Sequence, residues 1–156
     1  MKPTTKPKQL IVPLGMLNNA RQIMGYRSDV AYTIRFEDDN DTKADHTFFT
    51  FLAEAKSNPD CAHAMNEVTI VEAKRQINFS EQSTKWYESF PEVASHKALW
   101  ALAEEYSEQD DTCIAGVYAE IGEDDNDITT ERIGDGDFSW VGVERRIVTD
   151  WDEENT

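Results

Sequence analysis

Cysteine is scarce in this sequence, which has only Cys61 and Cys113 among its 156 residues. Two thiols so far apart provide neither a disulfide framework nor the Cys/His cluster of a structural zinc site. No apolar run approaches the roughly 20 residues of a transmembrane helix, and no glycine-rich loop is present that could cradle a phosphate. We therefore expect buried, reduced thiols in a cytoplasmic protein that has no membrane span and no cofactor.

Positive charge is also scarce, and it is unevenly placed. The chain has 15 Lys and Arg residues against 31 Asp and Glu residues, a formal net charge of −16. Residues 1–36 contain six basic residues and one acidic residue, whereas residues 104–156 contain three basic and eighteen acidic residues. Self-repulsion of this kind lowers the stability of a compact fold. The excess can serve solubility alone, but its concentration in the last third favours a positively charged partner.

The remaining composition is that of a folded domain. Hydrophobic residues make up 39% of the chain, and its length is sufficient to bury a hydrophobic core. We expect a flexible basic tail at residues 1–8, a single domain at residues 9–151 and an acidic tail at residues 152–156. The apolar segment that follows the basic tail is short and is broken by Pro13 and Gly15, which argues against a signal peptide.

Three segments have the apolar spacing of helices. Two of them begin with a pattern that resembles a capping box, formed by Thr42 with Asp45 and by Ser89 with Glu92. Pro59 is expected to end the second helix. The predicted helices cover residues 16–24, the segment from Thr42 to the stop at Asn58-Pro59, and the segment that follows Ser89 and ends in the acidic run of residues 104–111.

Strands are predicted where apolar residues alternate or β-branched residues cluster. The last three of these strands are separated by an acidic turn at residues 123–127 and by a glycine-rich turn at residues 134–137, so they should form an antiparallel meander. The predicted strands cover residues 30–36, 67–79 with a polar interruption, 113–121, 128–133 and 138–151. The expected fold class is α+β, a single domain with an antiparallel sheet, a C-terminal β-meander and two or three helices packed on the sheet.

One short motif resembles a nuclease site. Asp60 follows a proline, and Glu72 and Lys74 stand at the end of the apolar run 68–71. This arrangement resembles the motif of PD-(D/E)xK nucleases, in which an acid and a strand-borne Glu-x-Lys hold a metal and a water. The resemblance implies a metal-dependent phosphodiesterase site formed by Asp60, Glu72 and Lys74. The strong negative charge opposes the binding of a polyanion, so a solvated strand end is the favoured interpretation.

Other catalytic or metal-binding patterns are incomplete. An EF-hand loop needs glycine at its sixth position, but a loop begun at Asp39 has Ala44 there and one begun at Asp125 has Thr130. Two short-range pairs, Cys61 with His63 and Ser95 with His96, combine a nucleophile with a base. Neither pair has the glycine framing of a nucleophile elbow. The sequence therefore predicts no resident metal and no catalytic residue.

The acidic surface is the remaining candidate site. Duplex DNA carries one negative charge per roughly 1.7 Å of its axis, and side chains on one face of a strand recur about every 6.6 Å, so carboxylate-bearing strands and turns can imitate that field. Acids at the end of a helix oppose its macrodipole, which indicates another use for them. The predicted partner-binding residues are Glu104, Glu105, Glu108, Asp110, Asp111, Glu123, Asp124, Asp125, Asp127, Glu131, Asp135, Asp137 and Glu144.

The sequence thus favours a small acidic protein that binds a basic, nucleic-acid-handling protein and blocks it. In size and charge the chain resembles anti-restriction and anti-CRISPR proteins of phages and mobile elements, which implies a DNA mimic that makes protein–protein contacts and binds no nucleic acid itself. An immunity protein or antitoxin that neutralises a basic toxin has the same physical requirements. The metal-dependent nuclease is the alternative from a different class.

Overall fold

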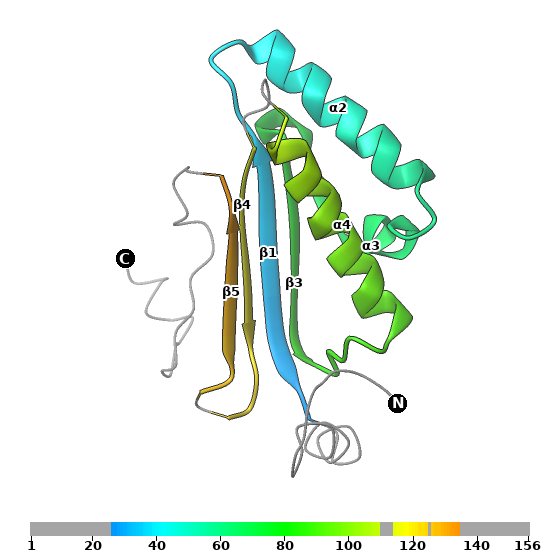
Figure 1. The fold of residues 1–156 in the computed structure, drawn as a ribbon, viewed down its shortest axis with the longest axis vertical. Coiled ribbons are helices and arrows are strands. Elements are labelled where there is room, and N and C mark those ends of the chain that lie inside the picture. The colour runs from blue at the N-terminus through cyan, green and yellow to red at the C-terminus, as the bar shows by residue number, and fades with distance from the viewer. Residues whose placement is uncertain (1–25, 110–113, 125, 135–156) are drawn as a thin grey trace.

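The computed structural model describes residues 26–109, 114–124 and 126–134. In this part of the chain five strands form one sheet in the order β2-β3-β1-β4-β5, and every neighbouring pair is antiparallel (Figure 1). The elements are β1 (Ser28–Phe36), α2 (Asp41–Ser57), α3 (Ala62–Glu67), β2 (Thr69–Val71), the 3-10 helix η1 (Glu72–Lys74), β3 (Gln76–Thr84), α4 (Pro91–Ser107), β4 (Ile114–Ile121) and β5 (Ile128–Ile133).

The connections form two interleaved split β-α-β units. Strands β1 and β2 are both antiparallel to β3, so they run in the same direction with β3 between them. Strands β3 and β4 are likewise both antiparallel to β1 and lie on either side of it. The helices α2 and α4 cross over within these units, as in other β-α-β-β-α-β arrangements. Strand β5 then joins β4 as a hairpin.

One face of the sheet carries the core. Alternate residues of β1, namely Val30, Tyr32, Ile34 and Phe36, are at most 2% exposed. The ring of Phe36 contacts Phe51 of α2, and the ring of Tyr32 contacts Trp100 of α4. Because residues two apart on a strand share a face, both long helices cover the same side of the sheet. The expected α+β fold with helices packed on an antiparallel sheet is therefore confirmed.

Most predicted elements are found close to their expected places. The strands expected at residues 30–36, 113–121 and 128–133 correspond to β1, β4 and β5, and the acidic segment 123–127 forms the turn between β4 and β5. The helix expected at residues 16–24, the third meander strand at residues 138–151 and the two tails lie outside the described residues. Gly134, at the start of the next predicted turn, has φ 76, and a Cβ there would collide with the carbonyl of Ile114.

Both predicted capping boxes are wrong. Helix α2 begins at Asp41, and its N-cap is Asn40, whose side chain accepts a hydrogen bond from the backbone N–H of Lys43. Asparagine is among the best N-cap residues, so it takes the position ahead of Thr42. Helix α4 begins at Pro91, and the residue before it, Phe90, is the N-cap without a side-chain bond. A residue that precedes proline is pushed into extended backbone, which is the conformation that an N-cap needs.

The strand predicted over residues 67–79 is also only partly correct. Residues 62–67 form helix α3, and the polar interruption is a reversal in which η1 and Arg75 connect β2 to β3. Arg75 adopts the left-handed conformation at φ 51 and is held there by hydrogen bonds to Phe36 in both directions. The reversal folds the apolar residues of the segment against each other, so that Ile70 pairs with Ile77.

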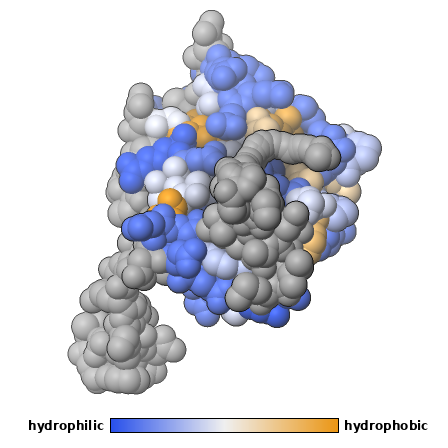
Figure 2. Space-filling view, turned by 60° about the horizontal axis from the view of Figure 1, so that its bottom comes forward, coloured by the Kyte–Doolittle hydropathy of each residue, from blue (hydrophilic) through white to orange (hydrophobic). Residues whose placement is uncertain are grey.

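The described surface is strongly polar. At the end of the molecule that carries the β4–β5 turn, hydrophilic residues dominate and hydrophobic ones form only small patches (Figure 2). The large hydrophobic residues that are exposed in the described segments are Phe49 and Ile128. No helix within the described residues is both long and apolar enough to span a bilayer.

Replacing Phe51 by alanine should lower the free energy of unfolding by about 3–5 kcal/mol, because this side chain is fully buried against the rings of Phe36 and Tyr106. Phe49 lies on the same helix but is 46% exposed, so Phe49→Ala is a matched control with an expected loss below about 1 kcal/mol. Urea unfolding followed by circular dichroism measures both. Equal losses would contradict this packing of α2.

Candidate functional site

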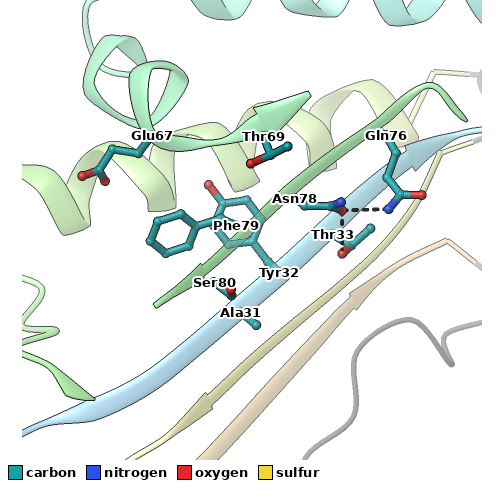
Figure 3. A pocket seen from close by; sticks show the side chains of 9 residues that line it. All are labelled: Ala31, Tyr32, Thr33, Glu67, Thr69, Gln76, Asn78, Phe79 and Ser80. Atoms are coloured by element: carbon teal, nitrogen blue, oxygen red, sulfur yellow. Dashed lines mark hydrogen bonds between the residues drawn. The ribbon is translucent and has the colours of Figure 1, made fainter. Parts of the chain in front are cut away.

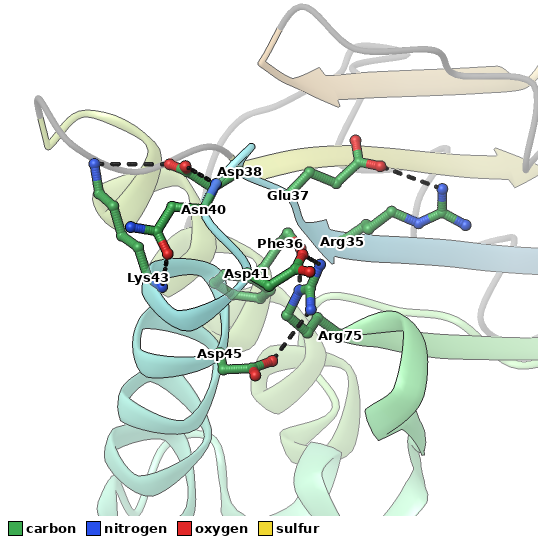
Figure 4. Close-up of polar contacts among 9 residues, drawn as sticks. All are labelled: Arg35, Phe36, Glu37, Asp38, Asn40, Asp41, Lys43, Asp45 and Arg75. Atoms are coloured by element: carbon green, nitrogen blue, oxygen red, sulfur yellow. Dashed lines mark hydrogen bonds and ion pairs between the residues drawn. The ribbon is translucent and has the colours of Figure 1, made fainter.

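The acidic turn after β1 is partly neutralised within the protein. Three basic side chains, from β1, α2 and the junction between η1 and β3, reach its carboxylates (Figure 4). The ion pairs are Arg35–Glu37 at 3.5 Å, Lys43–Asp38 at 3.6 Å, Arg75–Asp41 at 3.3 Å and Arg75–Asp45 at 3.2 Å. A basic partner would have to compete with these pairs, so this turn is a poor binding surface despite its composition.

The acidic turn between β4 and β5 is wrapped around a tyrosine. The hydroxyl of Tyr26 donates to the carboxylate of Asp127 and accepts from the backbone N–H of Asp124 at 3.0 Å. Glu123 accepts a hydrogen bond from the backbone N–H of Arg27 at 2.9 Å. These contacts fix the shape of the turn and occupy part of its hydrogen-bonding capacity.

A third group of acids lies where the end of α4 meets β5. Glu131 of β5 is paired in register with Tyr118, whose ring is buried under α4, so Glu131 lies on the helix-covered side of the sheet. Partial burial raises the pKa of Glu104, and repulsion from Glu131 and Glu108 raises it further. Carboxylates from two elements are therefore close enough to disfavour each other's ionisation.

The group extends along the sheet through Glu120. The hydroxyl of Tyr118 donates to Glu120 at 2.8 Å, and Lys97 of α4 lies 3.9 Å from the same carboxylate. Burial raises the pKa of Glu120, while the bond from Tyr118 and the charge of Lys97 oppose the rise and Asp127 adds to it. We call the acidic row the five residues Glu104, Glu108, Glu120, Asp127 and Glu131.

Within the described residues, the end of the row nearest the α4 terminus has no cationic counterpart. Glu104, Glu108 and Glu131 are exposed and form no ion pair with a described basic side chain, and Lys97 is the basic residue that faces Glu120. The end of α4 itself carries partial negative charge, which adds to the field of Glu104 and Glu108. This end of the row can bind cations without first breaking an internal pair.

The structure brings together some of the predicted partner-binding residues and separates others. Glu104, Glu108, Asp127 and Glu131 belong to the acidic row, and Glu105 is exposed beside it on α4. Glu123 and Asp124 lie in the Tyr26-bound turn. The other predicted residues, which are Asp110, Asp111, Asp125, Asp135, Asp137 and Glu144, lie outside the described residues.

The nuclease-like motif does not have the expected strand placement. Glu72 and Lys74 are in η1, not on a strand, and both are exposed. Asp60 is exposed in the turn before α3. The strand ends at Val71 because the chain reverses there through the left-handed Arg75. Among the described residues, no three His, Cys, Asp or Glu side chains are arranged to hold a metal ion.

A largely buried chain of hydrogen bonds, here called the relay, runs from Tyr32 through His96 to Glu67 and was not predicted from the sequence. The hydroxyl of Tyr32 lies 2.6 Å from Nδ1 of His96, and Nε2 of the same ring lies 2.7 Å from Oε1 of Glu67. His63, four residues before Glu67 on α3, lies 3.3 Å from that same oxygen. The relay connects β1, α4 and α3 and reaches the surface at Glu67, whose side chain is 40% exposed. The i, i+4 spacing of His63 and Glu67 was its only sequence signal, and it required α3 to be recognised as a helix.

Ser95 and Cys61, the nucleophiles of the two short-range pairs, both have structural roles. The hydroxyl of Ser95 accepts a hydrogen bond from the backbone N–H of Ala64 and so joins α4 to α3. Cys61 is fully buried, and burial together with the charges of Asp60 and Glu54 raises the pKa of its thiol. A raised pKa disfavours the reactive thiolate.

Comparison with protein-family models, with curated proteins and with solved structures found no match to this chain.

The relay predicts a loss of stability at mildly acidic pH. Burial lowers the pKa of His96 below its ordinary value of about 6.5, which holds in the unfolded chain. As pH falls below about 6.5 the unfolded chain takes up a proton that the folded protein does not, so the free energy of unfolding decreases. Urea unfolding between about pH 7.5 and pH 5 should show a weaker pH dependence for His96→Gln. His46→Gln, at an exposed site on α2, should behave like the wild type.

The acidic row predicts that removing one of its charges stabilises the protein. Glu131→Gln should raise the urea midpoint, because it relieves the repulsion that raises the pKa of Glu104. Glu72→Gln removes the same charge from exposed η1 and should have a smaller effect. The difference should shrink when salt screens the charges. A Glu131→Gln protein no more stable than Glu72→Gln would contradict the clustering.

Proposed function

We propose that this protein is a small acidic inhibitor that occupies the nucleic-acid site of a basic DNA- or RNA-handling protein, in the manner of an anti-restriction or anti-CRISPR protein. The acidic row carries the proposal. Its carboxylates come from α4, β4, β5 and the turn between them, they repel one another, and the exposed acids near the end of α4 lack internal partners among the described residues. An arrangement that lowers the stability of the free protein is understandable when a cationic partner relieves it.

The row is suited to this role because it is held in place. Tyr118, next to Glu120 and opposite Glu131, is 1% exposed, and the indole of Trp86 donates a hydrogen bond to its hydroxyl at 3.0 Å. The ring of Tyr118 also lies under the ammonium group of Lys97 at 4.4 Å. Because the backbone that carries the row is packed, binding a partner requires ordering of the exposed side chains and no rearrangement of these elements.

A basic groove that binds a phosphate backbone provides the positive charges that the acidic row lacks among the described residues. Such a groove presents several Lys and Arg side chains to a line of negative charge, and the contacts are strongly salt-dependent. The acids of the row would take the place of phosphates, and the net charge of −16 would steer the encounter from a distance. The proposed activity needs no catalytic residue and no cofactor.

The same acidic surface would suit an immunity protein or antitoxin that neutralises a basic toxin, and the identity of the partner separates the two functions.

We propose the cytoplasm as the site of action, since a buried free thiol such as Cys61 stays reduced there.

The test is capture of a partner by immobilised protein, with matched charge variants. The wild type should retain a basic nucleic-acid-binding protein from lysate of the source cells, and raised salt should release it. The Glu104→Gln/Glu131→Gln variant should release that partner at lower salt. The control Asp60→Asn/Glu72→Gln removes two exposed acids outside the row and should behave like the wild type. The purified partner should then lose DNA or RNA binding when the wild type is added.

Two results would overturn the proposal. One is a partner that is captured equally by the wild type and the Glu104→Gln/Glu131→Gln variant. The other is a captured partner whose nucleic-acid binding is unaffected by saturating amounts of the protein. The control variant also lacks two residues of the nuclease-like motif, so it reports whether any magnesium-dependent cleavage by the wild type depends on them.

A further inference from the structure

At one edge of the sheet, strand β2 is much shorter than its neighbour β3. Strand β2 has three residues and pairs only with Gln76–Asn78, whereas β3 continues to Thr84. The inner side of β3 is paired with β1 along most of its length. Beyond Asn78, the outer side of β3 has no strand beside it among the described residues. The shortness of β2 therefore leaves an open segment of sheet edge.

The register identifies the backbone groups that face outward there. The backbone N–H of Phe36 donates to the carbonyl of Arg75, the residue that precedes β3, so the ladder between β1 and β3 has a hydrogen-bonded position there. Hydrogen-bonded positions alternate along an antiparallel ladder. The backbone N–H and C=O of Phe79 therefore point toward β1, and those of Ser80 point away from β1 to the open edge. Ser80 and Gln82 are both exposed, so their outward N–H and C=O groups are accessible to another chain.

A pocket opens beside Thr69, the first residue of β2, where the pairing between β2 and β3 begins. It has a volume of about 370 Å³, and its wall includes Tyr32, Glu67, Thr69, Phe79 and Ser80. In Figure 3 Glu67 lies beyond the start of β2, near the rings of Tyr32 and Phe79. Both histidine contacts of the Glu67 carboxylate use Oε1, and the side chain is 40% exposed, so Oε2 can accept a further bond. Polar side chains, among them Thr33, Asn78 and Ser80, form most of its lining together with Glu67, whereas the rings of Tyr32 and Phe79 are 1% and 8% exposed and pack in the core.

We infer that this edge binds an extended segment of a partner protein, which adds a strand to β3 beyond β2 and places a Lys or Arg side chain in the pocket against Glu67. Main-chain bonds to Ser80 and Gln82 would provide affinity, and the pocket would provide specificity, as in other cases of strand addition. Glu81, on the same open segment, is exposed and adds a second negative charge. A cationic side chain fits the carboxylate of Glu67 and the polar lining of the pocket.

The charges decide between a basic segment and a second copy of this chain. Two copies paired through their β3 edges would bring Glu67 and Glu81 of each close to those of the other, within proteins that each carry a net charge of −16. Like charges across a strand pair are destabilising. A segment with positive charge is attracted by the same residues.

The site is short, because β3 is disturbed at its far end. Ser83 has φ 53, and the pairing with β1 shifts register in this region. The guanidinium of Arg27 donates to the carbonyl of Ser83, and Asp29 accepts from its N–H. Irregularities of this kind limit uncontrolled growth of an edge. The geometry therefore admits a short strand and opposes a long one.

This edge goes beyond the acidic row and can be tested separately from it. It lies on β3, and the row lies on α4, β4 and β5, with β1 between the two sets of strands. The probe is a capped octapeptide of alternating Thr and Arg, added to the full-length, ¹⁵N-labelled protein. The matched control probe is the same peptide with every second backbone nitrogen methylated, which keeps the charge but removes strand hydrogen bonds.

We expect the unmethylated probe to shift the amide signals of Ser80 and Gln82 and to slow their hydrogen exchange. Ser80→Pro should weaken this binding about tenfold, because it removes an outward donor, whereas Ser80→Ala should bind like the wild type. Glu67→Gln should weaken it about threefold to tenfold. The Glu104→Gln/Glu131→Gln variant should keep the response at Ser80 and Gln82, which separates this site from the row.

The inference is overturned if the methylated probe shifts Ser80 and Gln82 as strongly as the unmethylated one, or if neither probe shifts them. It is also overturned if the shifts occur only along the acidic row, since that result supports the proposed function alone. Should Ser80→Pro fail to fold, the comparison of the two probes on the wild-type protein decides the question.

Discussion

The hydroxyl of Tyr32 has to be satisfied inside the core, and the placement of α4 and α3 follows from that requirement. Tyr32 lies in the central part of β1 with 1% of its surface exposed, and its ring lies within 6.1 Å of the rings of Phe79, Tyr118 and Trp100. A buried hydroxyl without a partner is costly, so His96 of α4 must stand beside it. His96 is itself buried and needs an acceptor, which Glu67 of α3 provides.

A second constraint is the small number of basic side chains, three of which form ion pairs in one region. Arg35, Lys43 and Arg75 are all engaged around the turn that follows β1, where the chain passes from the sheet to α2 and back from η1 to β3. Arg75 also bonds to the backbone of Phe36, so this ion-pair cluster closes the end of the sheet. Among the described basic groups, Lys97 is the one that forms an ion pair with the acidic row, and none does so with Glu104, Glu108 or Glu131. The repulsion among Glu104, Glu108 and Glu131 is the consequence.

Local patterns predicted the strands of this fold well and its connections poorly. The alternation of Val30 to Phe36 was sufficient for β1, because burial on one face demands period two. The reversal at Arg75 could not be predicted, since a left-handed arginine is stabilised only by tertiary bonds to Phe36. Without that reversal, residues 67–79 were predicted as one interrupted strand, and α3 with its histidine and glutamate was missed.

The candidate site was predictable in composition and not in geometry. Counting carboxylates could not distinguish Asp41, which Arg75 neutralises, from Glu104, which repels Glu131. Glu120 was overlooked because it lies within an apolar strand, although its neighbour Tyr118 makes it part of the row. Ion pairing depends on which elements the topology brings together, and one-dimensional charge density contains no such information.

The raised pKa of Glu104 also says how a cation would act on the row. A positive side chain beside Glu104 opposes the electrostatic contribution of Glu131 and Glu108 and so acts to lower the pKa of Glu104. Further burial by the partner acts in the opposite direction, because burial is the main cause of the raised pKa. A cation placed between these acids adds attractive terms that offset their mutual repulsion. The acids that destabilise the free fold are therefore the ones that attract a basic partner most strongly.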